Sequence, residues 1–453
     1  MNPNGKWNPK TPPIDSLSKK FVGEQLMQEG SIPVLRVLRE INQFNDFVTL
    51  LTSHNRRNKV LQANPDVAFA GIIGLGCNIG PRQMAARSQG IEEHELVDLV
   101  QWRLSIENLQ KVNDSITDAI GELKLPIVYK IEENKIYSSS DGKKVPVSVE
   151  SLIANRSFKY LGKGSGVSVY SFIDEKQRLF HSMVFSPGDR EATFMIDGLM
   201  NQRCSTPRLH TTDTHGYTEA VFATTHLLGF AFAPRIRDIG SQTLSSLDPL
   251  NWFKGDREHI RPKYKINRKI IEAQWDDILR FIATIKSGRA TASQLFHRLN
   301  SHAKDHPLYR ALKEFGKIIK SNFILNYFDD LEFRQNIQKQ LNRGELIQKF
   351  HSDVFWDRGG EFHVGTMEEQ VKYTLCRSII ENAIIYWNYL YLTTRIVETK
   401  NRAEKEAYID ELTKGSVITW RHINFHGDYD FTKHVKSRVP FNKHKIQRVW
   451  LPK

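Results

Sequence analysis

The spacing of apolar residues along the chain changes its period twice. Over about residues 21–122 apolar positions recur every three or four residues, most clearly at 109–120, which is the spacing of one helix face. Between about residues 127 and 185 the period shortens to two, most clearly at 167–173, and this alternation predicts β-strands. The helical period returns beyond residue 240 and includes a long apolar helix over 375–390. The pattern therefore predicts a helical region, a mixed region and a second helical region.

The middle region alternates strands with helices. Strands are expected at 127–129, 136–140, 145–149, 167–173, 179–185, 209–212 and 230–236, and helices at 191–200 and 217–228. Taken in order, three antiparallel strands are followed by helix, strand, helix and strand. Such an order gives an α/β sheet with one crossover-connected half. It is also the order of the ribonuclease-H-like fold, which this region resembles.

Positive charge is concentrated in two segments. The 453 residues contain 64 Lys and Arg against 51 Asp and Glu, a formal charge of +13. Residues 254–269 are rich in cations and are interleaved with Trp252, Phe253 and Tyr264, and residues 431–453 carry cations and no acid. Clustered cations neutralise phosphates and aromatic rings stack on bases, so a nucleic acid is the expected partner. The alternative is a solvated basic surface with a flexible basic tail.

Composition also indicates the cellular compartment in which the chain is expected. No run of eighteen apolar residues occurs, and no apolar leader follows Met1, so neither a membrane span nor secretion is expected. The cysteines Cys77, Cys204 and Cys376 are too far apart in sequence to suggest a disulfide framework or a thiolate zinc site. We therefore expect a reduced, cytoplasmic setting.

Two aspartates at strand ends are the candidate catalytic groups. Cleavage or joining of phosphodiesters can use two divalent ions roughly 3.5–4 Å apart, and hard cations prefer carboxylate oxygens. Asp141 follows the expected strand 136–140, and Asp213 ends the strand 209–212. If these strands are neighbours at the sheet centre, both carboxylates emerge at one edge. The alternatives are an Asp141-Gly142 turn, and a helix N-cap for Asp213.

Two other motifs resemble binding sites. His210 and His215 flank Asp213, but their spacing fits no strong zinc pattern. The glycine-rich run 162–166 lacks the spacing of a phosphate-binding loop and is not followed by a helix, so it is interpreted as a turn.

Longer motifs resemble a known family. They lie at 140–142, 162–170, 197–199, 210–219, 222–230, 232–239, 341–345 and 382–388. In order and without large gaps over roughly residues 20–430, they are similar to the Tn3 family of replicative transposases. The resemblance implies a ribonuclease-H-like core with an Asp-Asp-Glu triad, which falls on Asp141, Asp213 and Glu345. For the third acid, Glu361, Glu368 and Glu369 are rivals, and Glu345 has the alternative of a first-turn residue stabilised by the helix dipole.

The resemblance also implies a chemistry. The triad would bind two Mg²⁺ ions, with Mn²⁺ as a substitute. Water would cleave the DNA at the transposon 3′ end, and the freed 3′-hydroxyl would attack a target phosphodiester, giving the family's cointegrate product. Contacts to DNA are expected from His215, Arg235, Arg237, Lys263 and Lys265. The partners would be double-stranded transposon and target DNA, bound by two copies of the chain in association with the nucleoid.

Together these observations divide the chain into six stretches. They are a linker or arm (1–20), a helical region (21–125), the ribonuclease-H-like core (126–240), a basic helical insertion (241–335), catalytic and packing helices (336–400) and a segment with a basic tail (401–453). Family members normally carry a long N-terminal region that recognises transposon ends, whereas about 120 residues precede the core here. We therefore expect the catalytic half of a transposase. A truncated, non-catalytic DNA-binding remnant and a metal-dependent nuclease of related fold stay open.

Overall fold

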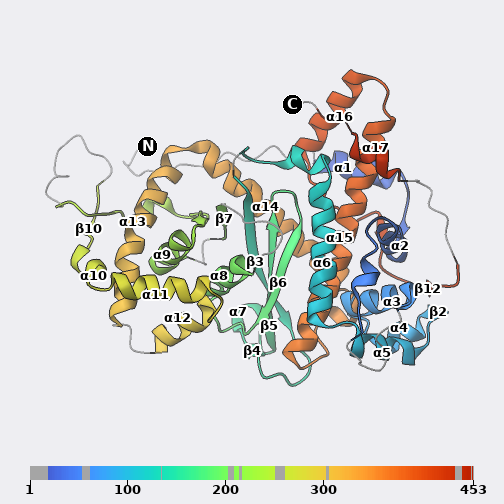
Figure 1. The fold of residues 1–453 in the computed structure, drawn as a ribbon, viewed down its shortest axis with the longest axis horizontal. Helices are drawn as coiled ribbons and strands as arrows, with labels where there is room; N and C mark the ends of the chain where they lie inside the picture. Colours follow the sequence, from blue (N-terminus) through green and yellow to red (C-terminus); the bar gives the residue numbers. More distant parts are fainter. Residues whose placement is uncertain are drawn as a thin grey trace. The chain divides into compact units, whose positions relative to one another are not determined.

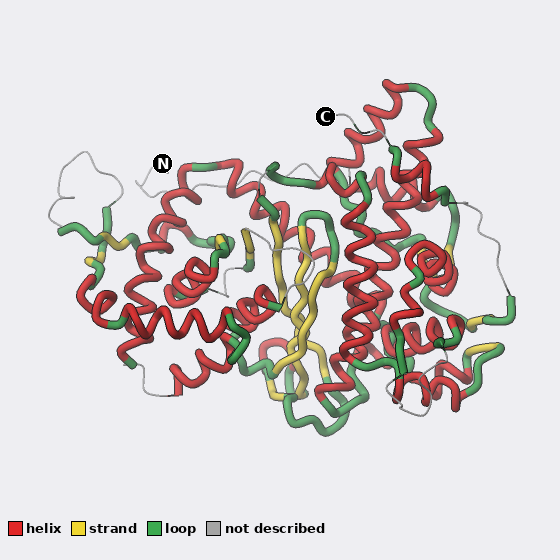
Figure 2. Tube along the Cα trace, in the orientation of Figure 1, coloured by secondary structure: helices red, strands yellow, loops and turns green. Residues whose placement is uncertain are grey.

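The computed structural model describes residues 19–53, 62–133, 135–201, 209–213, 217–249, 261–301, 306–433, 441–449 and 451. These residues form two compact units, each assembled from separate stretches of chain. Unit 1 contains Ile131–Ser140 and Arg190–Asn342, and unit 2 contains the residues up to Lys130, Asp141–Asp189 and those from Arg343 onward. Helices make up most of both units (Figure 2).

Unit 2 is built around one long buried helix, α15 (Met367–Glu398). Three helices pack against it: α2 (Val34–Asn45), α3 (Pro65–Gly76) and α6 (Ile106–Glu122). The apolar face predicted for α6 is fully buried, because its spacing places Leu109, Val112, Ile116 and Ile120 on one side. Helix α15 begins with a capping box, in which Thr366 and Glu369 satisfy each other's backbone N–H groups.

The remaining elements of unit 2 are short. They are α1 (Lys19–Met27), η1 (Phe47–Leu50), α4 (Pro81–Ala86), α5 (Glu93–Trp102), η3 (Leu125–Tyr129), α7 (Phe158–Leu161), η7 (Asp357–Gly360), α16 (Arg402–Lys414) and α17 (Lys443–Gln447). Two pairs of two-residue strands join distant segments in parallel: β1 (Ile32–Pro33) with β11 (Ile423–Asn424), and β2 (Ser88–Gln89) with β12 (Tyr429–Asp430).

A mixed sheet contains the strands predicted for the middle region. It comprises β3 (Tyr137–Pro146), β4 (Asn155–Arg156), β5 (Ser165–Asp174), β6 (Leu179–Phe185), β7 (Leu209–Thr211) and β8 (Ala231–Phe232), in the order β4-β5-β3-β7-β8 with β6 also on β5. Strands β5 and β6 run side by side (Figure 1) and are antiparallel, whereas β3–β7 and β7–β8 are parallel pairs. The α/β class is thus confirmed. Strand β3 enters unit 1 with Tyr137–Ser140 and continues in unit 2 from Asp141.

Unit 1 surrounds its strands with helices. They are α8 (Glu191–Met200), α9 (Glu219–Leu228), η5 (Ile239–Ser241), α10 (Arg268–Ala273), α11 (Trp275–Lys286), α12 (Ala292–Ser301) and α13 (Pro307–Asp329), with a parallel pair of β9 (Ser245–Ser246) and β10 (Tyr264–Lys265). Helices α9 and α13 approach so closely that a Cβ on Gly316 would lie 1.7 Å from the Glu219 carbonyl oxygen. Helix α14 (Leu331–Val354) begins in unit 1 and continues in unit 2 from Arg343.

Three strand predictions are wrong in detail. Residues 127–129 belong to the 3₁₀ turn η3, because Pro126 has the fixed φ that suits the first turn of a helix. The strands expected at 136–140 and 145–149 are one strand, β3, which passes through Asp141-Gly142. The strand expected at 230–236 is reduced to β8. Beyond it, Ala233 N still donates to His210 O of β7, and Arg235 N donates to Thr212 O, directly after β7. Pro234 lies between these donors, where its missing N–H faces away from β7.

Candidate active site

The two candidate aspartates follow neighbouring parallel strands. The register of β3 and β7 pairs Tyr137 with Leu209, Ser138 with His210 and Ser139 with Thr211. The prediction that these strands are neighbours is therefore confirmed. Asp141 and Asp213 each lie two residues beyond the last of these pairs.

His210 joins the two strands from inside unit 1. Its ring is fully buried, with Nδ1 2.8 Å from Ser138 Oγ and Nε2 2.7 Å from Ser140 Oγ. Burial lowers the pKa of His210 to about 3, so the ring is neutral. A neutral imidazole donates at one nitrogen and accepts at the other, so one serine hydroxyl accepts and the other donates. Because both nitrogens are occupied, His210 has no nitrogen left for a metal.

Asp141 lies inside β3, so its alternative as a turn residue is wrong. It is half-buried in unit 2, and its Oδ1 accepts from Gly142 N at 2.9 Å. Its carbonyl oxygen accepts from Gln348 Nε2 of α14 at 3.2 Å. Two residues further along β3, the Lys143 ammonium donates to the Ser352 hydroxyl. Helix α14 therefore runs beside the part of β3 that carries Asp141.

Asp213 is exposed in unit 1 and forms an ion pair. Its Oδ1 lies 2.9 Å from Arg235 Nη2, and Arg235 N donates to Thr212 O at 2.9 Å. Arg235 also approaches Gln338 Oε1 of α14 at 3.5 Å. The N-cap of α9 is Thr218, so the capping alternative for Asp213 is wrong. A cation expected to contact DNA thus lies against an acid expected to bind metal.

Glu345 is exposed in the middle of α14, far from its first turn, so the first-turn alternative is wrong. It precedes Gln348 by three residues, and residues at that spacing share one side of a helix. Because Gln348 contacts Asp141, Glu345 lies on a side of α14 that includes a β3 contact. Among its rivals, Glu368 pairs with Lys372 Nζ at 2.8 Å and Glu369 caps α15, which gives both a structural role.

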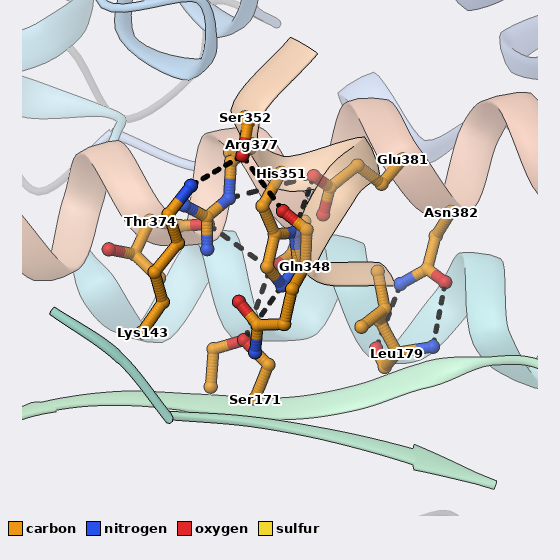
Figure 3. Close-up of polar contacts among 12 residues, drawn as sticks. Lys143, Ser171, Leu179, Gln348, His351, Ser352, Thr374, Arg377, Glu381 and Asn382 are labelled. Atoms are coloured by element: carbon orange, nitrogen blue, oxygen red, sulfur yellow. Dashed lines mark hydrogen bonds and ion pairs between the residues drawn. The ribbon is translucent and has the colours of Figure 1, made fainter. Parts of the chain in front are cut away.

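A buried polar network joins α14, α15 and β5 (Figure 3). The sequence pattern did not predict it. His351 Nδ1 lies 2.7 Å from Glu381 Oε1, and His351 Nε2 lies 3.0 Å from Ser171 Oγ on β5. Arg377 Nε is 3.6 Å from the same Glu381 oxygen. Burial raises the pKa of Glu381 to about 8 and lowers the pKa of His351 well below its usual value. The signal in the sequence was Arg377 and Glu381, four residues apart on an otherwise apolar helix.

The other residues expected to contact DNA are more dispersed. Arg237, Lys263 and Lys265 are exposed in unit 1, and Lys263 Nζ lies 5.7 Å from the centre of the Tyr264 ring. The prediction for His215 lies outside the described residues, as does Cys204. Cys77 and Cys376 are buried free thiols. None of the helices in the described ranges combines the length and apolarity that a membrane crossing needs.

The donor set fits a hard cation. Carboxylate oxygens are the protein ligands that Mg²⁺ prefers, and all three candidates carry them. Within the part of the chain that the structure describes, no group of three or more His, Cys, Asp and Glu side chains is arranged to hold a metal ion.

Comparison with known proteins places the chain among transposases. Residues 36–429 match the family model described as the Tn3 transposase DDE domain. The chain is 31% identical over 415 residues to the transposase for transposon Tn1546 of Enterococcus faecium, covering 91% of the chain and 41% of that protein. It is 31% identical over 411 residues to the transposase for Tn2501 of Escherichia coli (90% and 41%), and 28% identical over 432 residues to that for Tn21 (94% and 42%). The chain thus spans about two fifths of the length of these relatives.

Proposed function

Because the chain belongs to the Tn3 transposase DDE-domain family, we propose that it is the catalytic part of a DNA transposase. In this proposal, water cleaves the DNA at a transposon 3′ end, and the freed 3′-hydroxyl attacks a target phosphodiester in replicative transposition. One observation carries the assignment of the site. Strands β3 and β7 are paired in parallel, and Asp141 and Asp213 follow the last pair of this ladder by the same number of residues.

The strand order supports a ribonuclease-H-like core. Strands β3, β7 and β8 are consecutive parallel neighbours, and β5 lies on the other side of β3 with β6 antiparallel to it. In such a core, acids at the ends of the central strands face one edge of the sheet. This topology supports our proposal that Asp141 and Asp213 are the first two acids of the triad.

We assign the divalent ions to Asp141, Asp213 and Glu345, and propose two Mg²⁺ ions. When bound, such ions stabilise the charge that develops on the phosphate and lower the pKa of an attacking water. All three residues supply carboxylate oxygens, the protein ligands that such ions prefer.

The protein's own groups position the acids. His210 fixes Ser138 and Ser140 against β7, and so sets the register of the strand that leads into Asp141. Gln348 lies one turn after Glu345 on α14 and donates to the Asp141 carbonyl oxygen, which holds this part of α14 against β3. Arg235 neutralises Asp213 in the free protein, and in the complex its guanidinium would turn to a DNA phosphate.

Strand transfer by an Asp213→Asn protein tests the proposal. The full chain is incubated with a pre-cut transposon end, a target plasmid and Mg²⁺. We expect the joined product to fall by at least about 100-fold, the scale seen when a group that stabilises a charged transition state is removed. Asp238→Asn, an exposed acid in the same unit, is the matched control and should leave joining unchanged.

The same assay separates the alternatives. Undiminished strand transfer by Asp213→Asn contradicts the assignment of the site. Degradation of DNA without transposon ends, with no joined product, indicates a nuclease. Salt-dependent binding without metal-dependent nicking indicates a non-catalytic remnant.

A further inference from the structure

Three large apolar side chains project from the segment around β4 and α7 in unit 2. Phe158 is 83% exposed, Tyr160 is 58% exposed, and Leu152, just before β4, is fully exposed. We refer to these three residues, two of which are aromatic, as the aromatic patch. Large apolar side chains left exposed are common at binding sites.

The patch stands on an anchored base. Leu161, at the end of α7, is half-buried, and the backbone of Gly166 on β5 is so close that a Cβ there would lie 2.8 Å from Leu161 Cδ1 and 2.3 Å from Val145 O. Val147 N donates to Ser165 O at 3.0 Å, and Gly162 N donates to Phe158 O at 3.2 Å. Backbone hydrogen bonds therefore define the shape of the segment, while its rings, Phe158 and Tyr160, are exposed.

The charge within the segment that carries the patch has one sign. No acidic residue occurs between Ser151 and Ile173, whereas Arg156, Lys159 and Lys163 are all exposed. Lys159 Nζ lies 4.9 Å from the centre of the Tyr160 ring. Aromatic faces among cations suit single-stranded nucleic acid, because the cations neutralise phosphates and the rings stack on unpaired bases.

We propose that the aromatic patch binds DNA where base pairs are open, with Phe158 and Tyr160 stacked on unpaired bases and Arg156, Lys159 and Lys163 on the flanking phosphates. DNA as the ligand follows from the proposed function. Joining a 3′ end to a target strand while the other strand stays intact leaves a forked junction, and such a junction contains unpaired bases.

The base of the patch directly follows the strand that carries the proposed first acid. Val147, where this base begins, is six residues after Asp141, and a strand rises about 3.3 Å per residue, so the chain spans roughly 20 Å between Asp141 and the base of the patch.

A second copy of the chain is the competing occupant. In a two-fold contact the patch would meet itself, and the three cations of one copy would face the same three of the other. Such like-charge contacts are unfavourable, so the charge pattern favours a polyanion.

Fluorescence titration of the full chain tests the proposal. The probes are a forked DNA with 2-aminopurine at the unpaired positions and a blunt duplex of the same sequence, neither containing transposon ends. Phe158→Ala/Tyr160→Ala should weaken fork binding at least tenfold and leave duplex binding nearly unchanged, since stacking is lost only where bases are open. Lys159→Gln/Lys163→Gln should weaken the binding of both probes. It should also make the slope of log affinity against log salt concentration shallower by up to about two. The control is Ile127→Ala, an apolar residue 55% exposed in the same unit, which should bind as wild type.

The following results would overturn the proposal or separate it from the proposed function. Wild-type fork affinity in the double alanine variant, with an unchanged melting temperature, overturns the proposal. The proposal is also overturned if the variant still binds the fork but has a smaller molar mass than wild type in light scattering without DNA. That result would make the patch a contact between copies of the chain. If Asp213→Asn joins DNA normally while the double alanine variant loses fork binding, the proposed catalytic site fails and the inference about the patch stands.

Discussion

At the scale of single residues, Arg235 controls the charge next to its neighbouring acid. Its guanidinium lies 2.9 Å from Asp213, and both side chains are partly exposed. Exposed pairs of this kind contribute only about 0–1 kcal/mol to stability, so the pair is expected to matter little for folding. In the proposed site, the arginine occupies the position that a divalent ion would take beside the carboxylate.

Replacing Arg235 should therefore change metal binding more than folding. In Arg235→Gln the competing cation is gone, and we expect tighter binding of Mn²⁺ in the absence of DNA together with weaker binding of duplex DNA. Isothermal titration calorimetry with Mn²⁺ measures the first effect and fluorescence anisotropy the second. Arg237→Gln, exposed two residues away, is the control for Mn²⁺ binding. Unchanged or weaker Mn²⁺ binding in Arg235→Gln would show that the arginine does not compete with metal.

His210 makes stability depend on pH. The pKa of its ring is about 3 in the folded protein and about 6.5 when the chain is unfolded, so below pH 6.5 the unfolded state takes up a proton that the folded state does not. Stability is thus fully present above pH 6.5 and is lost as the pH falls toward 3. Between pH 6.5 and 5 this single group removes about 2 kcal/mol of unfolding free energy.

Urea unfolding at pH 7.5 and pH 5 checks this dependence. His210→Gln should lower stability at both values, because the pairing with Ser138 and Ser140 is disturbed, yet lose about 2 kcal/mol less than wild type on acidification. His297→Gln, which is exposed on α12, should follow the wild-type slope. An equal slope in His210→Gln would mean that the ring titrates in the folded protein.

At the scale of elements, patterns with a strong period were predictable. The apolar face of α6 and the positions of β5 and β6 follow directly from the 3.6- and 2-residue periods, whereas α15 and β5 are buried on all sides. The continuity of β3 was not predictable, because an Asp-Gly pair is more often a turn and only pairing with neighbouring strands keeps it extended. Likewise, the partners of Asp213 and the network around His351 depend on which distant segments meet, which local pattern does not encode.

The α9–α13 packing gives a prediction at this scale. Gly316→Ala would place a methyl group against the Glu219 carbonyl, so the helices must separate, and we expect a loss of roughly 1–3 kcal/mol or more of unfolding free energy. Gly23→Ala, in α1 with the nearest atom 3.9 Å away, is the opposite case and should be neutral or stabilising by up to about 1 kcal/mol. Urea unfolding followed by circular dichroism measures both. A neutral Gly316→Ala would contradict the close approach.

At the scale of the whole molecule, neither unit is one continuous stretch of sequence. Strand β7 in unit 1 takes one of its two neighbours, β3, from residues 131–140, about fifty residues before the rest of the unit begins. A fragment of residues 190–342 would therefore leave β7 with an open edge and His210 without its serine partners.

We expect this fragment to be poorly folded alone and to be rescued by a peptide of residues 131–142. Amide hydrogen exchange should show protection of residues 209–211 only when the peptide is present, because the strand then regains its ladder. A peptide with Ser138→Ala/Ser140→Ala is the matched control and should rescue less well. Full protection in the fragment alone would show that β3 is dispensable for unit 1.

Among the described residues, the chain passes between the units four times, after Lys130, Ser140, Asp189 and Asn342. Two of these passages fall inside regular elements, β3 and α14, whereas the one after Asp189 falls in a turn. Protein engineers who wish to split this molecule into two complementing polypeptides, or to graft a reporter into it, therefore have a natural opening at Asp189 and should leave the middle of β3 and α14 intact.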